Sequence, residues 1–234
     1  MNKIEGSKQG ERASLGMEIE VEPMRNAVRV VIIQHPQEPD KELGTAALCV
    51  RSLKNAELKI GLSWPSIRKA LGPEESVSDW GILYLGGEGL VIKNEVAVLS
   101  KKKEEINPPP PLKGIIVLDG TWSQAKTLWW RNPWFLKLPR IVLRPKTPSR
   151  YGRLRKEPRR ECLSTIESVA LCLRGLGDNP KITEQLNANF LKMLAEYQRR
   201  KEAHQPIVSG QVSPSRAASV ASNKESKIPD SQTE

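Results

Sequence analysis

The chain has 234 residues, a formal net charge of +10 and a pI of about 9.6. This length is enough for one domain with a sizeable core, with or without tails. The positive charge favours a polyanionic partner, either nucleic acid or an anionic membrane surface. Because no apolar run reaches membrane-spanning length and no signal-peptide core is present at the N-terminus, we exclude a membrane protein and expect a cytoplasmic one.

The first third of the chain predicts alternating strands and helices. Residues 1–26 are polar and aperiodic, and we expect them to be disordered. The β-branched run 28–35 is apolar on both faces, which is typical of a buried parallel strand, and 45–53 has a helical pattern. A short strand is expected within 58–64, and a helix over 65–72 begins with proline and ends with glycine.

The middle of the chain continues the pattern. Residues 80–90 predict a strand that runs into a Gly-rich turn, 114–122 another buried strand and 140–145 a third. The segment 123–135 predicts a helix with Ser123 as its N-cap. This helix carries tryptophans that we expect to cover the sheet, Trp129, Trp130 and Trp134.

Two helices and a tail end the chain. The helix 163–177 has Ser164 or Thr165 as its cap, and 182–201 is amphipathic. Residues 204–234 are rich in Ser, Pro, Lys and Gln, and we expect a disordered tail. The fold class is therefore α/β, with a mostly parallel sheet flanked by helices. Ligands of such sheets bind at the carboxyl ends of the strands.

The stretch VLDGTWSQAK, residues 117–126, places an acid, a hydroxyl and an indole at such a strand end. An isolated Asp-Gly is usually a turn or a helix cap, and Trp122 has the alternative of covering the sheet. Asp119 is however followed at once by Thr121 and Trp122. Two polar side chains and a flat ring at a strand end are suited to holding a ligand.

A basic stretch follows over residues 140–160, with nine Arg or Lys and one acid. The alternative is a solvated surface loop. Arginine outnumbers lysine here, and arginine suits bidentate contact with phosphate, while Tyr151 offers a ring on which a base can stack. We therefore expect contact with RNA or DNA.

The remaining motifs are weak alone. His35 is more often a structural residue than a catalyst, and the glycines of 84–89 match neither a dinucleotide fingerprint nor a P-loop. The cysteines, Cys49, Cys162 and Cys172, include no CxxC pair, so a zinc cluster is not indicated. An odd count without a disulfide framework suits a reducing compartment.

Seven segments occur in the order seen in DTW-domain proteins: HPQE, GTAAL, LYLGGEG, VLDGTWSQAKTL, LPRIVL, SRYGRLRKEP and LSTIESVA. The family is named for its Asp-x-Thr-Trp signature, which Asp119, Thr121 and Trp122 match. The chain thus resembles this family over roughly residues 28–197, and we expect residues 27–203 to form the DTW domain.

The resemblance implies a tRNA-uridine aminocarboxypropyltransferase. Such enzymes take the 3-amino-3-carboxypropyl group from S-adenosylmethionine and attach it to N3 of a tRNA uridine, which gives acp3U and methylthioadenosine. The family is related to the SPOUT class, so the resemblance also implies a C-terminal trefoil knot in which the cofactor binds. Many members carry a cysteine cluster before the first strand, but residues 1–48 contain no cysteine, so we expect no zinc.

The resemblance also implies roles for particular residues. Asp119 is expected to take the N3 proton or to act as an electrostatic partner of the sulfonium. Thr121 is expected to bind the amino or carboxylate group of S-adenosylmethionine, and Trp122 to pack on the adenine or the target base. The expected cofactor-binding residues are Leu85, Gly86, Gly87, Ser164, Thr165 and Glu167. The expected RNA-binding residues are Arg150, Tyr151, Arg153 and Arg155.

Two other functions stay open from the sequence. One is a knotted RNA methyltransferase that uses the same cofactor, and the other is an RNA-binding protein without enzymatic activity. The acid at the strand end argues against the second, because simple RNA binding does not need it. Nothing in the sequence indicates an obligate protein partner.

Overall fold

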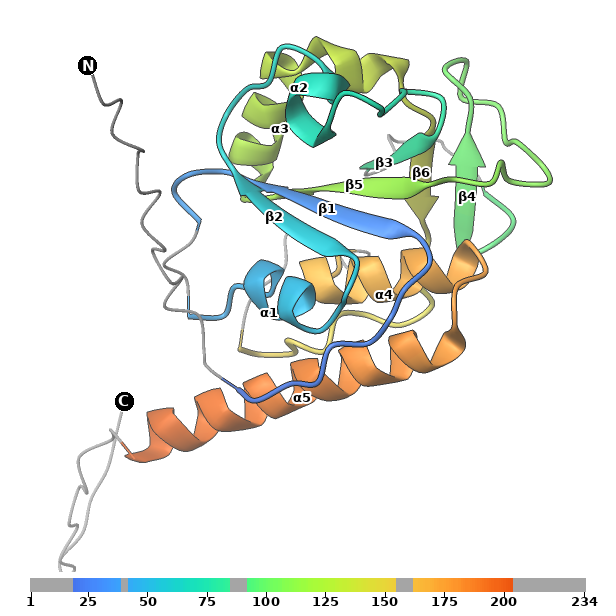
Figure 1. Ribbon diagram of the computed structural model, residues 1–234. Coiled ribbons are helices and arrows are strands. Elements are labelled where there is room, and N and C mark those ends of the chain that lie inside the picture. The colour runs from blue at the N-terminus through green and yellow to red at the C-terminus, as the bar shows by residue number, and fades with distance from the viewer. Residues whose placement is uncertain (1–18, 39–41, 85–91, 155–161, 204–234) are drawn as a thin grey trace, which may run out of the picture. The chain divides into compact units, whose positions relative to one another are not determined.

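The structure is a computed structural model, which describes residues 19–38, 42–84, 92–154 and 162–203. Its central element is a six-stranded sheet with the order β2-β1-β5-β3-β6-β4 (Figure 1). The strands are β1 (Arg29–Gln34), β2 (Ala56–Ile60), β3 (Trp80–Tyr84), β4 (Val96–Leu99), β5 (Gly114–Asp119) and β6 (Arg140–Leu143). Neighbouring strands are parallel except for β4, which is antiparallel to β6. The expected α/β class with a mostly parallel sheet is confirmed.

Helices cover both faces of this sheet (Figure 1). They are α1 (Ala46–Arg51), α2 (Ile67–Leu71), α3 (Trp122–Arg131), the 3-10 helix η1 (Pro133–Lys137), α4 (Thr165–Gly175) and α5 (Pro180–Ala203). One layer holds α1, α4 and α5, and the opposite layer holds α2, α3 and η1. Within the described residues, no helix combines the length and apolar character needed to cross a membrane.

Each face of the sheet has its own apolar core, because successive strand residues point to opposite faces. On β5, Ile115 packs in the core beneath α4 and α5, while Ile116 packs in the core beneath α3 and η1. Both side chains are fully buried, which is why this strand is apolar without alternation. Complete burial of one such side chain contributes about 1.5–3 kcal/mol.

The amino ends of three strands are joined by the buried carboxylate of Glu75. It accepts hydrogen bonds from Trp80 Nε1 at 2.8 Å and Arg29 Nη1 at 3.2 Å, and Lys113 Nζ lies 2.9 Å away. Burial alone would raise the pKa of Glu75, but the hydrogen bonds from Lys113 and Trp80 and the charges of Lys113 and Arg29 hold that pKa below its ordinary value. This network fixes one edge of the sheet and leaves the carboxyl edge for the site.

The structure corrects three expectations about the backbone. The strand β4 was not predicted, because its four residues lie between charged segments and give too short a pattern. The cap of α3 is Thr121 rather than Ser123. Met24, which lies in the segment expected to be disordered, pairs with Leu53 and donates its N–H to Ser52 O at 2.9 Å. Residues 1–18 and 204–234 lie outside the described residues.

Candidate active site

Asp119 is the last residue of β5 and lies beside Gln34, the last residue of β1. The chain turns sharply after it, because Gly120 has φ of +155°, a conformation that side chains disfavour. Helix α3 then begins at Trp122. The parallel register therefore brings Asp119 and Gln34 to the same carboxyl edge, and the glycine takes the chain away from that edge into the helix.

Two side chains hold the Asp119 carboxylate. Gln34 Nε2 donates to Oδ2 at 2.8 Å, and Thr165 Oγ1 donates to Oδ1. The donors come from β1 and from the first residue of α4. One donor on each oxygen fixes the plane of the carboxylate, so that its remaining lone pairs have defined directions. The DTW signature and the Leu-Ser-Thr segment, which are 46 residues apart in sequence, meet in this contact.

Gln34 is a site residue that the sequence analysis did not identify. Gln34 is 4% exposed, and its Oε1 has no hydrogen-bond partner among the described residues. A buried acceptor without a partner costs about 1–3 kcal/mol, so this carbonyl is unfavourable for stability. Unfavourable polar groups of this kind are expected at functional sites. The signal in the sequence that could have identified Gln34 is its position as a polar residue at the end of an apolar strand.

Cys49 of α1 lies buried near Asp119. Burial raises the pKa of its thiol well above the ordinary value, and the negative charge of Asp119 raises it further. The thiol therefore stays protonated and is not a nucleophile. Cys172 behaves similarly, since burial raises its pKa to about 12. Both cysteines lie in the core, as the sequence predicted.

Thr121 and Trp122 lie at the start of α3. The Thr121 hydroxyl accepts from the Gln124 N–H at 3.4 Å, and Gln124 Oε1 accepts from the Thr121 N–H at 2.6 Å, so the two residues form a capping box. The Thr121 hydroxyl proton still has freedom to donate. Trp122 is 42% exposed, which rules out the alternative that it covers the sheet as a core residue.

Ser164 and Glu167 form the capping box of α4 and are both buried. The Glu167 carboxylate accepts from Ser164 N at 3.0 Å and Ser164 Oγ at 2.7 Å, from Ser149 Oγ at 2.6 Å and from Arg150 N at 2.8 Å. The Ile166 N–H donates to Thr45 Oγ1 at 3.3 Å. These groups satisfy one another, which argues against direct cofactor binding by Ser164 and Glu167. Of the α4 residues predicted for the site, Thr165 is the one that contacts Asp119.

Tyr151 does not fit its predicted role as a stacking platform. It is 2% exposed, its ring meets Phe190 edge-on with centroids 5.0 Å apart, and its hydroxyl donates to Leu43 O. A ring buried in this way has no free face for a base, so the stacking prediction is wrong. Tyr151 instead attaches the segment after β6 to α5.

The predicted RNA-binding arginines have different surroundings. Arg150 donates to Asn187 Oδ1 at 3.1 Å and lies 3.6 Å from Glu167 Oε1, so it is partly engaged within the protein. Arg153 is exposed. Four further predicted residues lie outside the described residues, namely Leu85, Gly86, Gly87 and Arg155.

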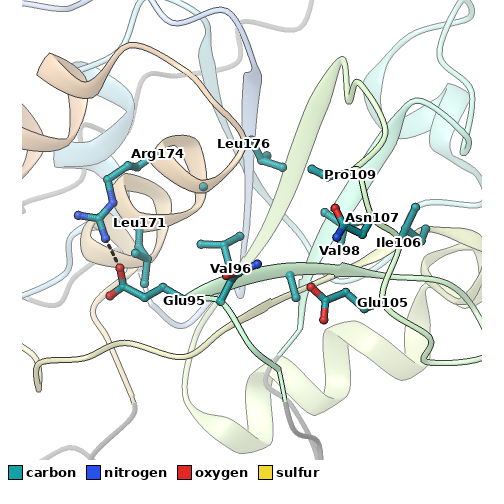
Figure 2. Close-up of a pocket in the computed structure, with 13 residues that line it drawn as sticks. Glu95, Val96, Val98, Glu105, Ile106, Asn107, Pro109, Leu171, Arg174 and Leu176 are labelled. Carbon is teal, nitrogen blue, oxygen red and sulfur yellow. Dashed lines mark hydrogen bonds and ion pairs between the residues drawn. The ribbon is translucent and has the colours of Figure 1, made fainter.

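A separate cavity of about 270 Å³ lies between β4, the last turns of α4 and residues 105–109 (Figure 2). Glu95 and Arg174 form an ion pair at its wall, with Oε2 and Nη2 2.7 Å apart. Arg174 is nine residues beyond Thr165 on α4, which is about 13 Å along the helix. The cavity therefore lies at the other end of α4 from Asp119 and is not part of this site.

The described part of the chain gathers no group of three or more His, Cys, Asp or Glu side chains that would hold a metal ion. The chemistry available at the carboxyl edge is thus that of a fixed carboxylate, a buried amide and two hydroxyl groups. Such a set can bind a cationic or N–H-bearing ligand and can take up a proton.

Comparison with known proteins gives a family match. The family model of the DTW domain matches residues 16–198. The tRNA-uridine aminocarboxypropyltransferase 2 of Macaca fascicularis is 32% identical over 170 residues, which cover 70% of this chain and 53% of that protein. The enzyme of the same name from Mus musculus is 31% identical over 169 residues, 71% of this chain and 53% of that protein. The tRNA-uridine aminocarboxypropyltransferase A of Arabidopsis thaliana is 26% identical over 199 residues, covering 72% and 70%.

The chain spans about half the length of the first two relatives. No solved structure matches it. The match to the family covers Asp119, Thr121 and Trp122 as well as Gln34 and Thr165.

Proposed function

Because the chain belongs to the DTW-domain family, we propose that it transfers the 3-amino-3-carboxypropyl group of S-adenosylmethionine to N3 of a tRNA uridine. The names of its relatives support this activity. The observation that carries the proposal is the Asp119 carboxylate, held on both oxygens by Gln34 and Thr165 at the carboxyl edge of the sheet. That edge is where ligands of parallel sheets bind.

S-adenosylmethionine supplies an electrophilic carbon next to a positively charged sulfur. The residues at this edge suit its aminocarboxypropyl end, which carries an ammonium group with several N–H donors. Asp119 offers lone pairs and Gln34 Oε1 is an acceptor that lacks a partner among the described residues. Gln34 Nε2 is bonded to the same carbon as Gln34 Oε1 and lies 2.8 Å from Asp119 Oδ2. Gln34 Oε1 therefore lies within about 5.4 Å of Asp119 Oδ2. These acceptors thus fit the ammonium group of the proposed co-substrate.

The protein has two tasks in this reaction. It must fix which carbon beside the sulfur faces the uridine, because the methyl carbon is also electrophilic. It must also assist the loss of the N3 proton, because N3 is a weak nucleophile until that proton leaves. In the balanced reaction the new N3–C bond replaces the C–S bond, the proton leaves N3, and methylthioadenosine is released.

Asp119 is suited to either task. As a base it takes the N3 proton through a lone pair that Gln34 and Thr165 leave open. As an electrostatic partner it holds a positive charge of the co-substrate. We assign Thr121, with its hydroxyl at the start of α3, to the amino or carboxylate group and Trp122 to the adenine or target base. Leu85, Gly86 and Gly87 are proposed to approach the co-substrate through their backbone, and Arg153 and Arg155 to bind tRNA phosphates.

We also propose that the fold carries the trefoil knot that the family resemblance implies. The strand order supports it, since β5 lies between β1 and β3 while β6 lies beyond β3. The chain must therefore return past β3 and β5 to place Thr165 against Asp119. An experimental structure that traces residues 85–91 and 155–161 tests the knot, and an unthreaded course would refute it.

The activity is tested with purified protein, unmodified tRNA and S-adenosylmethionine labelled separately in the methyl and in the carboxypropyl group. We expect label from the carboxypropyl group to enter tRNA. Entry of methyl label would instead make the protein a methyltransferase. The variant Asp119→Asn keeps the shape of the side chain and removes its charge, and we expect it to abolish most of the transfer while tRNA binding persists.

A further inference from the structure

Helix α3 exposes two indole rings on the side away from the sheet. Trp122 is 42% exposed and Trp130 is 74% exposed, although both belong to the same ten-residue helix. Lys126, midway between them, is also exposed. We define these residues, Trp122, Lys126 and Trp130, as the α3 stripe. Trp130 was expected to cover the sheet, and its exposure corrects that expectation.

The stripe follows from helix geometry. Residues four apart on a helix are neighbours on one face, and successive members of the stripe are four apart. With 100° between residues, the three side chains lie within an arc of about 80°. The two indoles are about 12 Å apart along the helix axis, at 1.5 Å per residue. The inward side of the helix is formed by Leu128, which is fully buried, and by Trp129, whose ring packs against Tyr84 and Phe135.

The charge around the stripe selects the kind of partner. Residues 120–139, which include α3 and η1, contain no Asp or Glu and three Lys or Arg. Arg131, next to Trp130, and Lys137 of η1 are also exposed. The core of a protein–protein interface is depleted in lysine, while aromatic rings next to cations are typical of surfaces that bind single-stranded nucleic acid. Repeated positive charge without acids complements a phosphate backbone.

We propose that the α3 stripe binds an unpaired segment of RNA, with the target base stacked on Trp122, a further base on Trp130 and a phosphate at Lys126. The 12 Å spacing corresponds to about three to four nucleotide steps of 3.4 Å. Because α3 begins three residues after Asp119, the bound RNA segment would run from the proposed reaction centre along the helix. The partner rests on the proposed function, which supplies tRNA as the substrate, but the surface is distinct from the basic stretch that follows β6.

The test measures binding of unmodified tRNA without S-adenosylmethionine, so that it does not depend on catalysis. We expect Trp130→Ala to weaken binding by roughly 5- to 150-fold, the range found for loss of one base–aromatic stack. Trp130→Tyr keeps an aromatic face and is expected to recover most of the affinity. Lys126→Gln is expected to lower the slope of log affinity against log salt by about one.

Leu136→Ala is the matched control, because Leu136 is an exposed apolar residue of the neighbouring η1 that lacks a ring. It is expected to change tRNA affinity less than twofold. Unchanged tRNA affinity in Trp130→Ala would overturn the proposal. If Trp130→Ala bound tRNA more weakly but the wild-type protein transferred no label, the role of the α3 stripe would be upheld and the proposed activity refuted. Failure of the stripe and failure of the proposed activity are therefore distinguishable.

Discussion

The replacement of Glu167 separates a structural role from a role in cofactor binding. Its carboxylate accepts four hydrogen bonds from Ser149, Arg150 and Ser164, and its side chain is 3% exposed. We therefore predict that Glu167→Ala destabilises the protein. We also predict that the Michaelis constant for S-adenosylmethionine stays within about twofold of the wild-type value in protein that remains folded, because the carboxylate faces the protein rather than a ligand.

The magnitude follows from the donors left behind. Alanine leaves the N–H groups of Arg150 and Ser164 without their acceptor, at about 1–3 kcal/mol for each buried donor. The hydroxyl groups of Ser149 and Ser164 can rotate toward other acceptors, so we assign them little of the cost. The free energy of unfolding should fall by about 2–6 kcal/mol. Glu167→Gln keeps one acceptor oxygen for Arg150 and should cost about half of this.

Urea unfolding, followed by tryptophan fluorescence, measures this loss. Glu184→Ala is the control, because Glu184 is exposed on α5, and it should change the free energy of unfolding by less than about 0.5 kcal/mol. If Glu167→Gln raised the Michaelis constant for S-adenosylmethionine tenfold with no loss of stability, the carboxylate would contact the co-substrate and the reasoning would be wrong.

Three further predictions concern Asp119, Gln34 and Glu75. If Asp119 is the base, Asp119→Asn lowers kcat and leaves the Kd of S-adenosylmethionine unchanged in calorimetry; if it is an electrostatic partner, the same variant raises that Kd. Gln34→Met removes a buried acceptor without a partner, so the urea midpoint of the variant should equal or exceed that of the wild type. The variant also lacks the hydrogen-bond donor to Asp119, so its initial rate of transfer should fall at least tenfold. A lower midpoint with an unchanged rate would contradict this. Glu75→Gln should cost about 2 kcal/mol at pH 7. The pKa of Glu75 is lower in the folded than in the unfolded protein, so the ionised carboxylate stabilises the fold above the unfolded pKa, and this stabilisation is lost as pH falls through the folded pKa. The unfolding curves of wild type and variant should therefore converge in acid. A difference that stays constant with pH would refute the ionic role.

The sequence was sufficient for the parallel part of the sheet. The apolar runs that became β1 and β5 are buried on both faces, and such runs identify a parallel strand without any information on its neighbours. Asp119 follows one of these runs directly, so the sequence also placed it at the carboxyl edge of a parallel sheet, where ligands bind. The short antiparallel β4 was missed, because four residues give no clear period and its pairing with β6 is a tertiary contact.

The sequence was not sufficient for the surroundings of individual side chains. Tyr151 lies among arginines in the sequence, yet its ring is buried against Phe190, which is 39 residues further along the chain. Trp129 and Trp130 are adjacent and identical in type, but one packs against Tyr84 and the other is exposed, because neighbouring helix positions are 100° apart. Gln34 became a site residue only when the register of β1 and β5 placed it beside Asp119.

The central claim is that Asp119 and its neighbours direct the carboxypropyl carbon, and not the methyl carbon, toward a uridine of tRNA. Chromatography of the nucleoside released during a reaction with unmodified tRNA tests this claim most directly, because each carbon leaves a different product. We predict methylthioadenosine, released in equal amount to the modified uridine formed. Release of adenosylhomocysteine, with methyl groups found on the tRNA, would contradict it.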